Sequence, residues 1–371
     1  MTELFIGLMS GTSLDGVDGV LADFGTSPLN VRAHASAALE PELKAELLQL
    51  NQPSDNELHR AALAANALMR VYADVVRQLL SAASVSASQI TAIGAHGQTV
   101  RHQPQLHDGT GYTLQLANPS LLAELSGIDV VADFRSRDVA AGGQGAPLVP
   151  VFHQTVFGEP NQAVAVLNIG GMANLTALSP ALSAGVMGFD CGPGNALMDA
   201  WCLRHRGLPY DAGGAWAATG QVQADLLASL LTAPFFALPP PKSTGRDLFS
   251  PDWLEQQLSG FTGLAPVDVQ ATLTELTARA CADSFRSYGF DSQRLIVCGG
   301  GAFNTHLMTR LQALLPEVGV TRSDEHGLPA QQVEATAFAW LARKMIRREA
   351  LSLQSITGTR GARVLGALYP A

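Results

Sequence analysis

Short apolar runs alternate along this chain with longer segments of helical periodicity. Residues 4–9 form an apolar run long enough for one buried strand. A polar turn over Ser10–Gly16 follows, and residues 17–24 are again mostly apolar. Two such runs joined by a turn of Gly, Ser, Thr and Asp are typical of a β-hairpin. Residues 31–39 predict a third strand, so the chain is expected to open with an antiparallel meander.

Helical periodicity and further short apolar runs alternate through the rest of the first half. The helix expected over 55–80 begins at Asp55, a residue type favoured at helix N-termini, and carries apolar residues at helical spacing. The pattern predicts helices over 41–50, 55–80 and 119–127, and strands over 90–94, 112–117 and 129–134.

The second half repeats the opening theme. Residues 163–178 read as an apolar strand, a turn over Gly170–Asn174 and another apolar strand. A strand over 186–189 ends at Asp190, and a strand over 295–298 runs into Gly299–Asn304. A helix is expected to follow Asn195 and to run through residue 205. Further helices are expected over 222–231, 251–258, 267–288 and 331–349. Alternating strands and helices indicate α/β architecture, and the repeated hairpin predicts two related domains flanking a cleft. Their expected bounds are 1–135 with a C-terminal tail of about 350–371, and 136–349.

Composition narrows the classes of function. A chain of 371 residues is too long for one typical hydrophobic core, which suggests two domains. Its formal net charge of -9 argues against sequence-independent nucleic-acid binding. The sequence has neither a signal-peptide pattern nor an apolar run of membrane-spanning length. Its four cysteines are scattered without a CxxC pair, which predicts a reduced, cytoplasmic protein.

Three glycine-rich turns carry the candidate chemistry, each following an apolar strand: Ser10–Gly16, Gly170–Asn174 and Gly299–Asn304. Backbone N–H groups in such turns can bind phosphate. The P-loop, dinucleotide, HExxH and GxSxG motifs are all missing from the sequence. An ordinary tight turn explains the first segment equally well, and close strand-to-helix packing is the alternative for Gly299–Gly301. Three such turns in this order favour a nucleotide held by two hairpins and an adenosine turn.

Longer motifs carry a resemblance to a known family. They are Gly7-Leu-Met-Ser-Gly-Thr-Ser-Leu-Asp-Gly-Val-Asp18, Gly94-Ala-His-Gly-Gln-Thr-Val-Arg-His102, Val131-Ala-Asp-Phe-Arg135, Asp138-Val-Ala-Ala-Gly-Gly-Gln-Gly-Ala-Pro147, Leu167-Asn-Ile-Gly-Gly-Met-Ala-Asn174, Phe189-Asp-Cys-Gly-Pro-Gly-Asn195, Val297-Cys-Gly-Gly-Gly-Ala-Phe-Asn304 and Glu334-Ala-Thr-Ala-Phe-Ala339. In this order they span nearly the whole chain, and the sequence resembles the anhydro-N-acetylmuramic acid kinases of the actin, sugar-kinase and heat-shock-chaperone ATPase superfamily. Cys191 stands where that family often has Thr.

The resemblance implies two related actin-like ATPase (ribonuclease H-like) domains and an unusual reaction. ATP would phosphorylate O6 of 1,6-anhydro-N-acetylmuramic acid while water opens the anhydro bridge. The product would be N-acetylmuramic acid 6-phosphate, in peptidoglycan recycling. Because O6 carries no proton while it is bonded to C1, a base must activate water against C1, as in an inverting glycosidase. Asp190 is the predicted base, because it ends a strand before a Gly-Pro-Gly turn that leaves room for the sugar.

The other site residues follow the same resemblance. Asp15 and Asp18 are expected near Mg²⁺, directly or through water. Arg135 is expected to bind the lactyl carboxylate of the sugar, and His96, Gln98 and Glu334 to line its pocket, although His96 could instead be satisfied by local backbone. The residues expected to bind ATP are Ser10, Gly11, Thr12, Ser13, Leu14, Asp15, Gly16, Val17, Asp18, Asn168, Gly170, Gly171, Asn174, Gly299, Gly300, Gly301 and Asn304.

Two other functions remain open from the residues alone. An ordinary sugar kinase of the same superfamily would use Asp190 to deprotonate a sugar hydroxyl. An ATP-switched binding protein would carry a peptide-binding module or polymerisation insertions, which the sequence does not indicate. The resemblance also favours a homodimer. The proline-rich segment 237–247 is predicted to be a surface loop that could reach a substrate or move.

Overall fold

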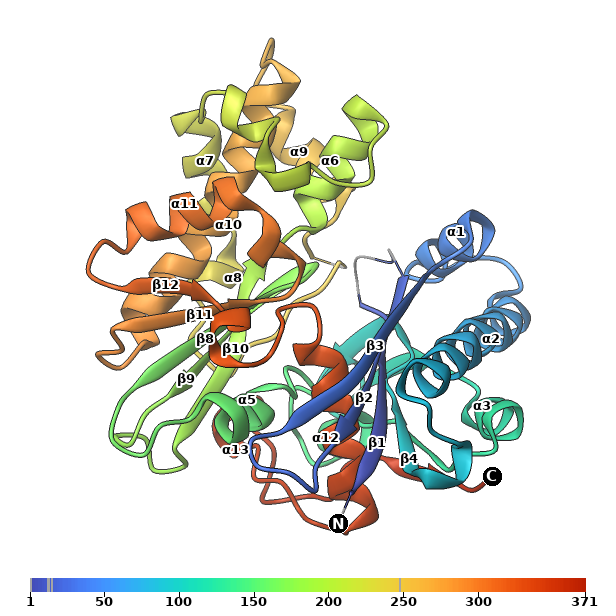
Figure 1. Cartoon of the computed structure of the whole chain (residues 1–371). Helices are drawn as coiled ribbons and strands as arrows, with labels where there is room; N and C mark the ends of the chain where they lie inside the picture. Colours follow the sequence, from blue (N-terminus) through green and yellow to red (C-terminus); the bar gives the residue numbers. More distant parts are fainter. Residues whose placement is uncertain (1, 12–13, 15, 247) are drawn as a thin grey trace. The chain divides into compact units, whose positions relative to one another are not determined.

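The computed structural model describes residues 2–371 apart from 12, 13, 15 and 247, and these residues form two compact units (Figure 1). Unit 1 comprises residues 1–152 and 331–371, and unit 2 comprises residues 153–330. Residues 136–152 and 331–349 therefore group with the first unit, whereas the sequence placed them in the second. The physical reason for the later segment is close packing of helix α12 (Val333–Ile346) on strand β1 (Leu4–Met9). A Cβ on Gly7 of β1 would lie 1.8 Å from the carbonyl oxygen of Ala335.

The sheet of unit 1 has the strand order β13-β7-β4-β1-β2-β3. Strand β1 pairs antiparallel with β2 and parallel with β4, so the opening hairpin sits at the middle of the sheet. The other strands of this sheet are β2 (Gly16–Asp23), β3 (Asn30–Ala38), β4 (Ile90–Ala95), β7 (Val130–Ala132) and β13 (Ala367–Tyr369).

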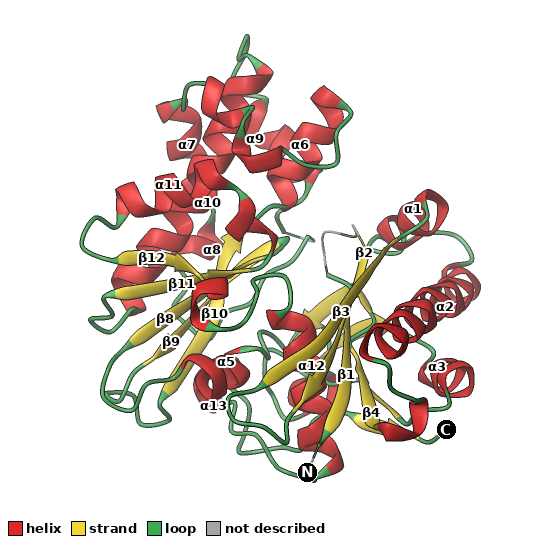
Figure 2. Cartoon of the chain, viewed as in Figure 1, coloured by secondary structure: helices red, strands yellow, loops and turns green. Residues whose placement is uncertain are grey.

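Helices cover both faces of this sheet. Helix α2 (Glu57–Ala83) packs on β2 and β3, and α12 packs on β1, β2 and β4 (Figure 2). A Cβ on Gly19 would lie 2.4 Å from Val75 of α2, which places α2 on the face opposite α12. The remaining elements of the unit are α1 (Pro41–Gln49), η1 (Ala87–Gln89), β5 (Gln98–Pro104), β6 (Gly111–Leu116), α3 (Pro119–Ser126), α4 (Ser136–Ala140) and α13 (Gln354–Thr357), with α5 (Pro150–Phe157) crossing into unit 2.

The sheet of unit 2 has the order β10-β9-β8-β11-β12. Strands β8 (Val164–Ile169) and β9 (Met172–Leu178) form the second predicted hairpin, and β11 (Arg294–Cys298) runs parallel to β8. The edge strands are β10 (Val186–Pro193) and β12 (Gly319–Arg322). The carboxyl ends of β8 and β11, where both glycine turns begin, therefore lie at one edge of the sheet.

Helix α10 (Pro266–Tyr288) is the main support of unit 2. It packs against β9 and β10 and contacts α6 (Ala196–Arg206), α7 (Ala224–Leu231) and α11 (Thr305–Leu314). The smaller elements are η2 (Ala212–Gly214), η3 (Ala217–Thr219), α8 (Pro234–Ala237), α9 (Pro251–Leu258), η4 (Gly300–Phe303) and η5 (Ser323–His326).

The α/β class and both hairpins are confirmed by these sheets. Strands β12 and β13 lacked a sequence signal, because one is four residues of partly exposed chain and the other only three residues long. Within the described residues, the helices are too short or too polar for any of them to cross a membrane.

Candidate active site

A row of polar side chains crosses the sheet of unit 2. Asp190 of β10 pairs with Asn174 of β9, Asn174 pairs with Asn168 of β8, and Asn168 pairs with Cys298 of β11. Directly paired residues on neighbouring strands point to the same face of a sheet. The Cys298 thiol donates to Asn168 Oδ1 at 3.7 Å, and Asn174 Oδ1 is buried without a hydrogen-bond partner among the described residues. The structure thus brings together three predicted site residues from separate strands.

The turn after β11 contains three glycines, and close packing leaves no room for a side chain at two of them. Gly299 has a φ of +78°, and a Cβ there would lie 2.4 Å from Asn168 Oδ1. A Cβ on Gly301 would also lie 2.4 Å from the Ile169 side chain, so close packing accounts for these two glycines. Gly300 differs, because the nearest atom to its Cβ would be the Asn195 amide nitrogen at 3.6 Å, an ordinary contact.

The β8–β9 turn is tied to the loop that follows Asp190. The Gly170 carbonyl accepts a hydrogen bond from the Asn195 N–H at 2.8 Å, and the Gly171 carbonyl accepts from the Gly194 N–H at 2.9 Å. The Asn195 side chain donates to the Ile169 carbonyl at 3.2 Å. Residues 170–171, 194–195 and 299–301 therefore form one glycine-rich cluster. Asn304, predicted to contact adenosine, caps helix α11 by accepting from the Leu307 N–H at 3.0 Å.

Asp190 is held in a defined orientation at the edge of this cluster. Its side chain is 5% exposed, and a β-bulge begins immediately after it. The Thr244 N–H donates to Asp190 Oδ2 at 2.8 Å, while the Asp190 N–H donates to the Lys242 carbonyl at 3.1 Å. Bulges re-aim side chains next to active sites. One carboxylate oxygen is thus fixed by backbone from the loop 238–246.

That loop is more firmly anchored than the sequence suggested. Lys242 is 7% exposed, and its ammonium donates to the carbonyls of Phe235 and Phe236 at 3.2 and 3.4 Å. The ammonium also lies 4.6 Å from the centre of the Phe235 ring. Burial lowers the pKa of Lys242, while the nearby Asp190 carboxylate opposes that shift. The prediction of an open surface loop is wrong for Lys242, because carbonyls and rings satisfy its charge in place of water. Asp247, at its end, lies outside the described residues.

In unit 1, His96 holds Arg135. His96 Nδ1 lies 2.7 Å from the Gly97 carbonyl, which can only accept, so Nδ1 carries the proton. Nε2 then accepts from Arg135 Nη2 at 2.9 Å. Burial, followed by the charge of Arg135, lowers the pKa of His96 to about 3. Arg135 Nη1 also donates to the Gly145 carbonyl at 2.9 Å. Neutral His96 is satisfied by local backbone, as the alternative interpretation held, and at the same time positions Arg135.

The first glycine turn is only partly described. Thr12, Ser13 and Asp15 lie outside the described residues. The Ser10 hydroxyl donates to the Gly97 carbonyl at 2.9 Å and lies 2.9 Å from the Tyr72 hydroxyl. Burial raises the pKa of Tyr72. The Gln98 side-chain amide donates to the Gly11 carbonyl at 3.1 Å, and its Oε1 is buried without a partner among the described residues.

Other predicted residues of unit 1 are placed as follows. Leu14 and Val17 are buried in the core, at 1% and 0% exposure. Their predicted contact with phosphate could therefore be made only by their backbone groups. Asp18 on β2 is 46% exposed and lies 3.6 Å from His34 Nε2. Gly16 begins β2, and Glu334 lies half-buried in the first turn of α12.

The donor chemistry for magnesium is present but incomplete in what the structure describes. Mg²⁺ prefers one or two carboxylates together with phosphate oxygens and water. Asp18 offers a half-exposed carboxylate at the base of the hairpin. No group of three or more His, Cys, Asp or Glu side chains suited to a metal occurs among the described residues. Among the described residues, the Asp18 carboxylate therefore fits a metal that is shared with nucleotide phosphates.

Sequence reasoning missed three residues of these clusters. Tyr72 reads as a core position of a helix, and Lys242 and Thr244 read as loop. The polar Lys-Ser-Thr-Gly-Arg segment was the local sequence signal that could have drawn attention to Lys242 and Thr244. Their contacts with Asp190 span about fifty residues of sequence, so local patterns could not predict them.

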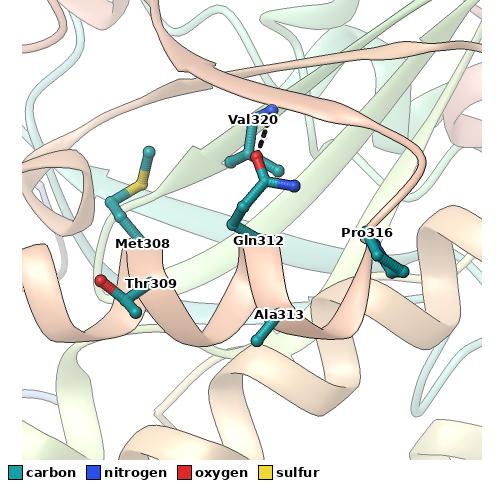
Figure 3. A pocket seen from close by; sticks show the side chains of 6 residues that line it. All are labelled: Met308, Thr309, Gln312, Ala313, Pro316 and Val320. Carbon is teal, nitrogen blue, oxygen red and sulfur yellow. Dashed lines mark hydrogen bonds between the residues drawn. The ribbon is translucent and has the colours of Figure 1, made fainter.

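A depression on the surface of unit 2 lies elsewhere. Met308, Thr309, Gln312 and Ala313 of α11 line it together with Pro316 and Val320 (Figure 3). Gln312 Oε1 accepts from the Val320 N–H at 3.2 Å, and its amide donates to the carbonyls of Leu315 and Val318. This depression contains no predicted site residue.

The two sheets define an α/β protein, and unit 2 places a glycine-rich cluster beside a buried carboxylate. The chain belongs to the anhydro-N-acetylmuramic acid kinase family, whose sequence model matches residues 3–371. It is 64% identical over 389 residues to "Anhydro-N-acetylmuramic acid kinase" of Albidiferax ferrireducens, covering 100% of both chains. The protein of that name from Variovorax paradoxus is 65% identical over 372 residues, covering 100% of this chain and 99% of the relative.

A more distant curated relative agrees. "Anhydro-N-acetylmuramic acid kinase" of Cupriavidus metallidurans is 56% identical over 373 residues, covering 100% of this chain and 98% of the relative. Among solved structures, the activator of 2-hydroxyisocaproyl-CoA dehydratase from Clostridium difficile has a TM-score of 0.49 at 12% identity, covering 95% of this chain and 99% of that one. Because that score is below 0.5, the α/β assignment rests on the sheets of this chain and on its family.

Proposed function

We propose that this chain is an ATP-dependent kinase that opens the anhydro ring of 1,6-anhydro-N-acetylmuramic acid with water and phosphorylates O6. The products are N-acetylmuramic acid 6-phosphate and ADP, within peptidoglycan recycling. Family membership supports the reaction. The structural observation that carries it is the buried carboxylate of Asp190, fixed by the Thr244 N–H at the glycine-rich end of the sheet.

The substrate's chemistry explains the need for this carboxylate. O6 is bonded to C1 and carries no proton, so it becomes a phosphate acceptor only as the C1–O6 bond breaks. Asp190 takes a proton from water, the water oxygen bonds to C1, and the O6 electron pair attacks the γ-phosphorus as ADP leaves. General-base catalysis of this kind contributes about 10²–10⁴-fold to rate. The γ-phosphoryl group takes the place of the general acid.

Other residues bind and orient the reactants in this proposal. Gly170, Gly171 and Gly300 let the nucleotide approach the backbone at the cluster in unit 2, together with Asn168 and Asn174. Arg135, fixed by His96 and the Gly145 carbonyl, pairs with the lactyl carboxylate. Gln98 and Glu334 hydrogen-bond the sugar.

Three further features belong to the proposal. Magnesium, held by Asp18 and by Asp15 of the first glycine turn, directly or through water, neutralises phosphate charge when bound. The protein acts as a cytoplasmic homodimer, with ATP and the amino sugar as its partners and neither nucleic acid nor membrane among them. The four cysteines, which are all buried and not joined in disulfides, support a reducing location.

Incubation with ATP, Mg²⁺ and either the anhydro sugar or free N-acetylmuramic acid tests the function. The expected result is ADP and sugar phosphate from the anhydro sugar alone. Phosphorylation of only the free sugar would identify an ordinary sugar kinase. ATP hydrolysis that is indifferent to both sugars would identify an ATP-switched binding protein.

A further inference from the structure

The loop 238–246 makes two separate backbone contacts with the residue that carries the chemistry. The Lys242 carbonyl accepts from the Asp190 N–H at 3.1 Å, and two residues later the Thr244 N–H donates to Asp190 Oδ2 at 2.8 Å. The first contact joins two backbone groups, and the second joins the loop backbone to the Asp190 carboxylate. A hydrogen bond from backbone to a carboxylate is charge-assisted and fixes the orientation of the acceptor.

The side chain of Lys242 anchors the loop between these contacts. Its buried ammonium donates to the Phe235 and Phe236 carbonyls of α8 and lies over the Phe235 ring. A charged group that is this buried needs such partners, because an unsatisfied charge is costly. Thr244 is therefore held at a fixed position relative to Asp190.

The Thr244 hydroxyl has no evident role in that anchoring. Its Oγ1 is buried and lacks a hydrogen-bond partner among the described residues. Leaving a buried hydroxyl unpaired costs free energy, and native proteins seldom do so without a ligand or water at the site. Oγ1 is three bonds from the N–H that binds Asp190, so covalent geometry keeps it close to the carboxylate. The Oγ1 atom thus marks a place for a hydrogen-bond donor beside the base.

We propose that Thr244 positions the attacking water, an inference that rests on the proposed function. One water proton passes to the Asp190 carboxylate, and the other is donated to Thr244 Oγ1 as a hydrogen bond. The oxygen lone pair then points at C1, the new C1–O bond forms, the C1–O6 bond breaks, and O6 receives the γ-phosphoryl group while ADP leaves. Holding a reactant by two contacts reduces the orientational freedom lost on the way to the transition state.

Substitutions that remove only the hydroxyl test this inference. Thr244→Val keeps the backbone N–H and the side-chain shape, Thr244→Ala removes the hydroxyl without added bulk, and Thr244→Ser retains the hydroxyl. Thr309→Val, on the exposed surface of α11, is the matched control. The assays are kcat and KM for ATP and for the anhydro sugar, the pH dependence of kcat, and the melting temperature.

We expect Thr244→Val and Thr244→Ala each to lower kcat about tenfold, the effect of one neutral hydrogen bond. KM for both substrates and the pH midpoint of kcat should stay unchanged, because Asp190 keeps its N–H donor. Thr244→Ser should restore most of kcat, and Thr309→Val should match the wild type. Full kcat in both Val and Ala variants, a Ser variant as slow as Val, or a loss confined to KM would each overturn the inference. A wild-type enzyme that does not turn over the anhydro sugar would instead overturn the proposed function.

Discussion

The substitution Asp190→Asn removes the proposed base while preserving its shape. The introduced asparagine keeps a carbonyl oxygen that can accept from the Thr244 N–H, so the orienting contact at 2.8 Å survives. What is lost is the negative charge and the ability to take a proton from water. Asp190→Asn therefore changes the charge and basicity of the side chain but keeps its shape, whereas Asp190→Ala would also remove the contact with the Thr244 N–H.

The magnitude follows from these contacts. Converting a charge-assisted hydrogen bond into a neutral one should cost about 1 kcal/mol of folding free energy. Loss of a general base should lower kcat about 10²–10⁴-fold, equivalent to about 3–5 kcal/mol in the activation barrier. The effect on catalysis therefore greatly exceeds the effect on stability.

The assay compares kcat for the anhydro sugar with ATP affinity and melting temperature in one preparation. We expect kcat to fall by at least about a hundredfold, with ATP affinity unchanged and melting temperature nearly so. If Asp190→Asn retains wild-type kcat, another group activates the water and the assignment is wrong. If ATP affinity falls in parallel with kcat, Asp190 acts in nucleotide binding.

Three other predictions follow from the described contacts. Arg135→Gln should raise KM for the anhydro sugar about 10–100-fold, the worth of a charged hydrogen bond, without a comparable effect for an analogue that lacks the lactyl group. Gly300→Ala should raise KM for ATP without lowering the melting temperature, because its Cβ would meet no protein atom closer than 3.6 Å. The melting temperature should fall as pH drops below 6.5, because burial lowers the pKa of His96 and of His153 to about 3 from the usual 6.5.

The sign of the pH effect comes from proton counting. Between about pH 3 and pH 6.5 the unfolded chain binds protons on these histidines that the folded chain does not, so folding stability is lost as pH falls. Each such histidine contributes about 1.4 kcal/mol per pH unit in that window. The His153→Gln variant should therefore show a weaker dependence of melting temperature on pH. A wild-type melting temperature that stays constant from pH 7 to pH 5 would contradict this prediction.

Control measurements distinguish the expected effects of Gly300→Ala and Arg135→Gln on KM from a general loss of stability. Gly260→Ala, where a Cβ meets no atom within 4 Å, should leave both KM and stability unchanged. An unaltered KM for ATP in Gly300→Ala would remove that glycine from the nucleotide site. An equal rise in KM for the analogue and for the true sugar in Arg135→Gln would show that Arg135 does not recognise the lactyl carboxylate.

Local patterns predicted most of the elements, because a hairpin or a helix depends on neighbours in sequence. Both glycine-tipped hairpins and helix α10 follow directly from apolar spacing and turn residues. The assignment of α12 to a unit could not be predicted in this way. Its apolar spacing shows that it is a helix, but the contact of Gly7 with Ala335 decides which sheet it covers.

The site shows the same limit. Motifs identified Asp190, Asn174 and Asn168 separately, whereas strand register places them in one row. Lys242 read as surface because lysine is rarely buried. The carbonyls of Phe235 and Phe236, together with the Phe235 ring, make its burial tolerable.

The most direct test of the central claim follows the oxygen and the stereochemistry of the product. The reaction is run with ATP and the anhydro sugar in ¹⁸O-labelled water and examined by NMR and mass spectrometry before mutarotation proceeds. Attack of water at C1 with inversion predicts the α-anomer first, with the label at C1 and none in the C6–O–phosphate bridge. The β-anomer formed first, or label between C6 and phosphorus, would contradict water activation at C1 by Asp190.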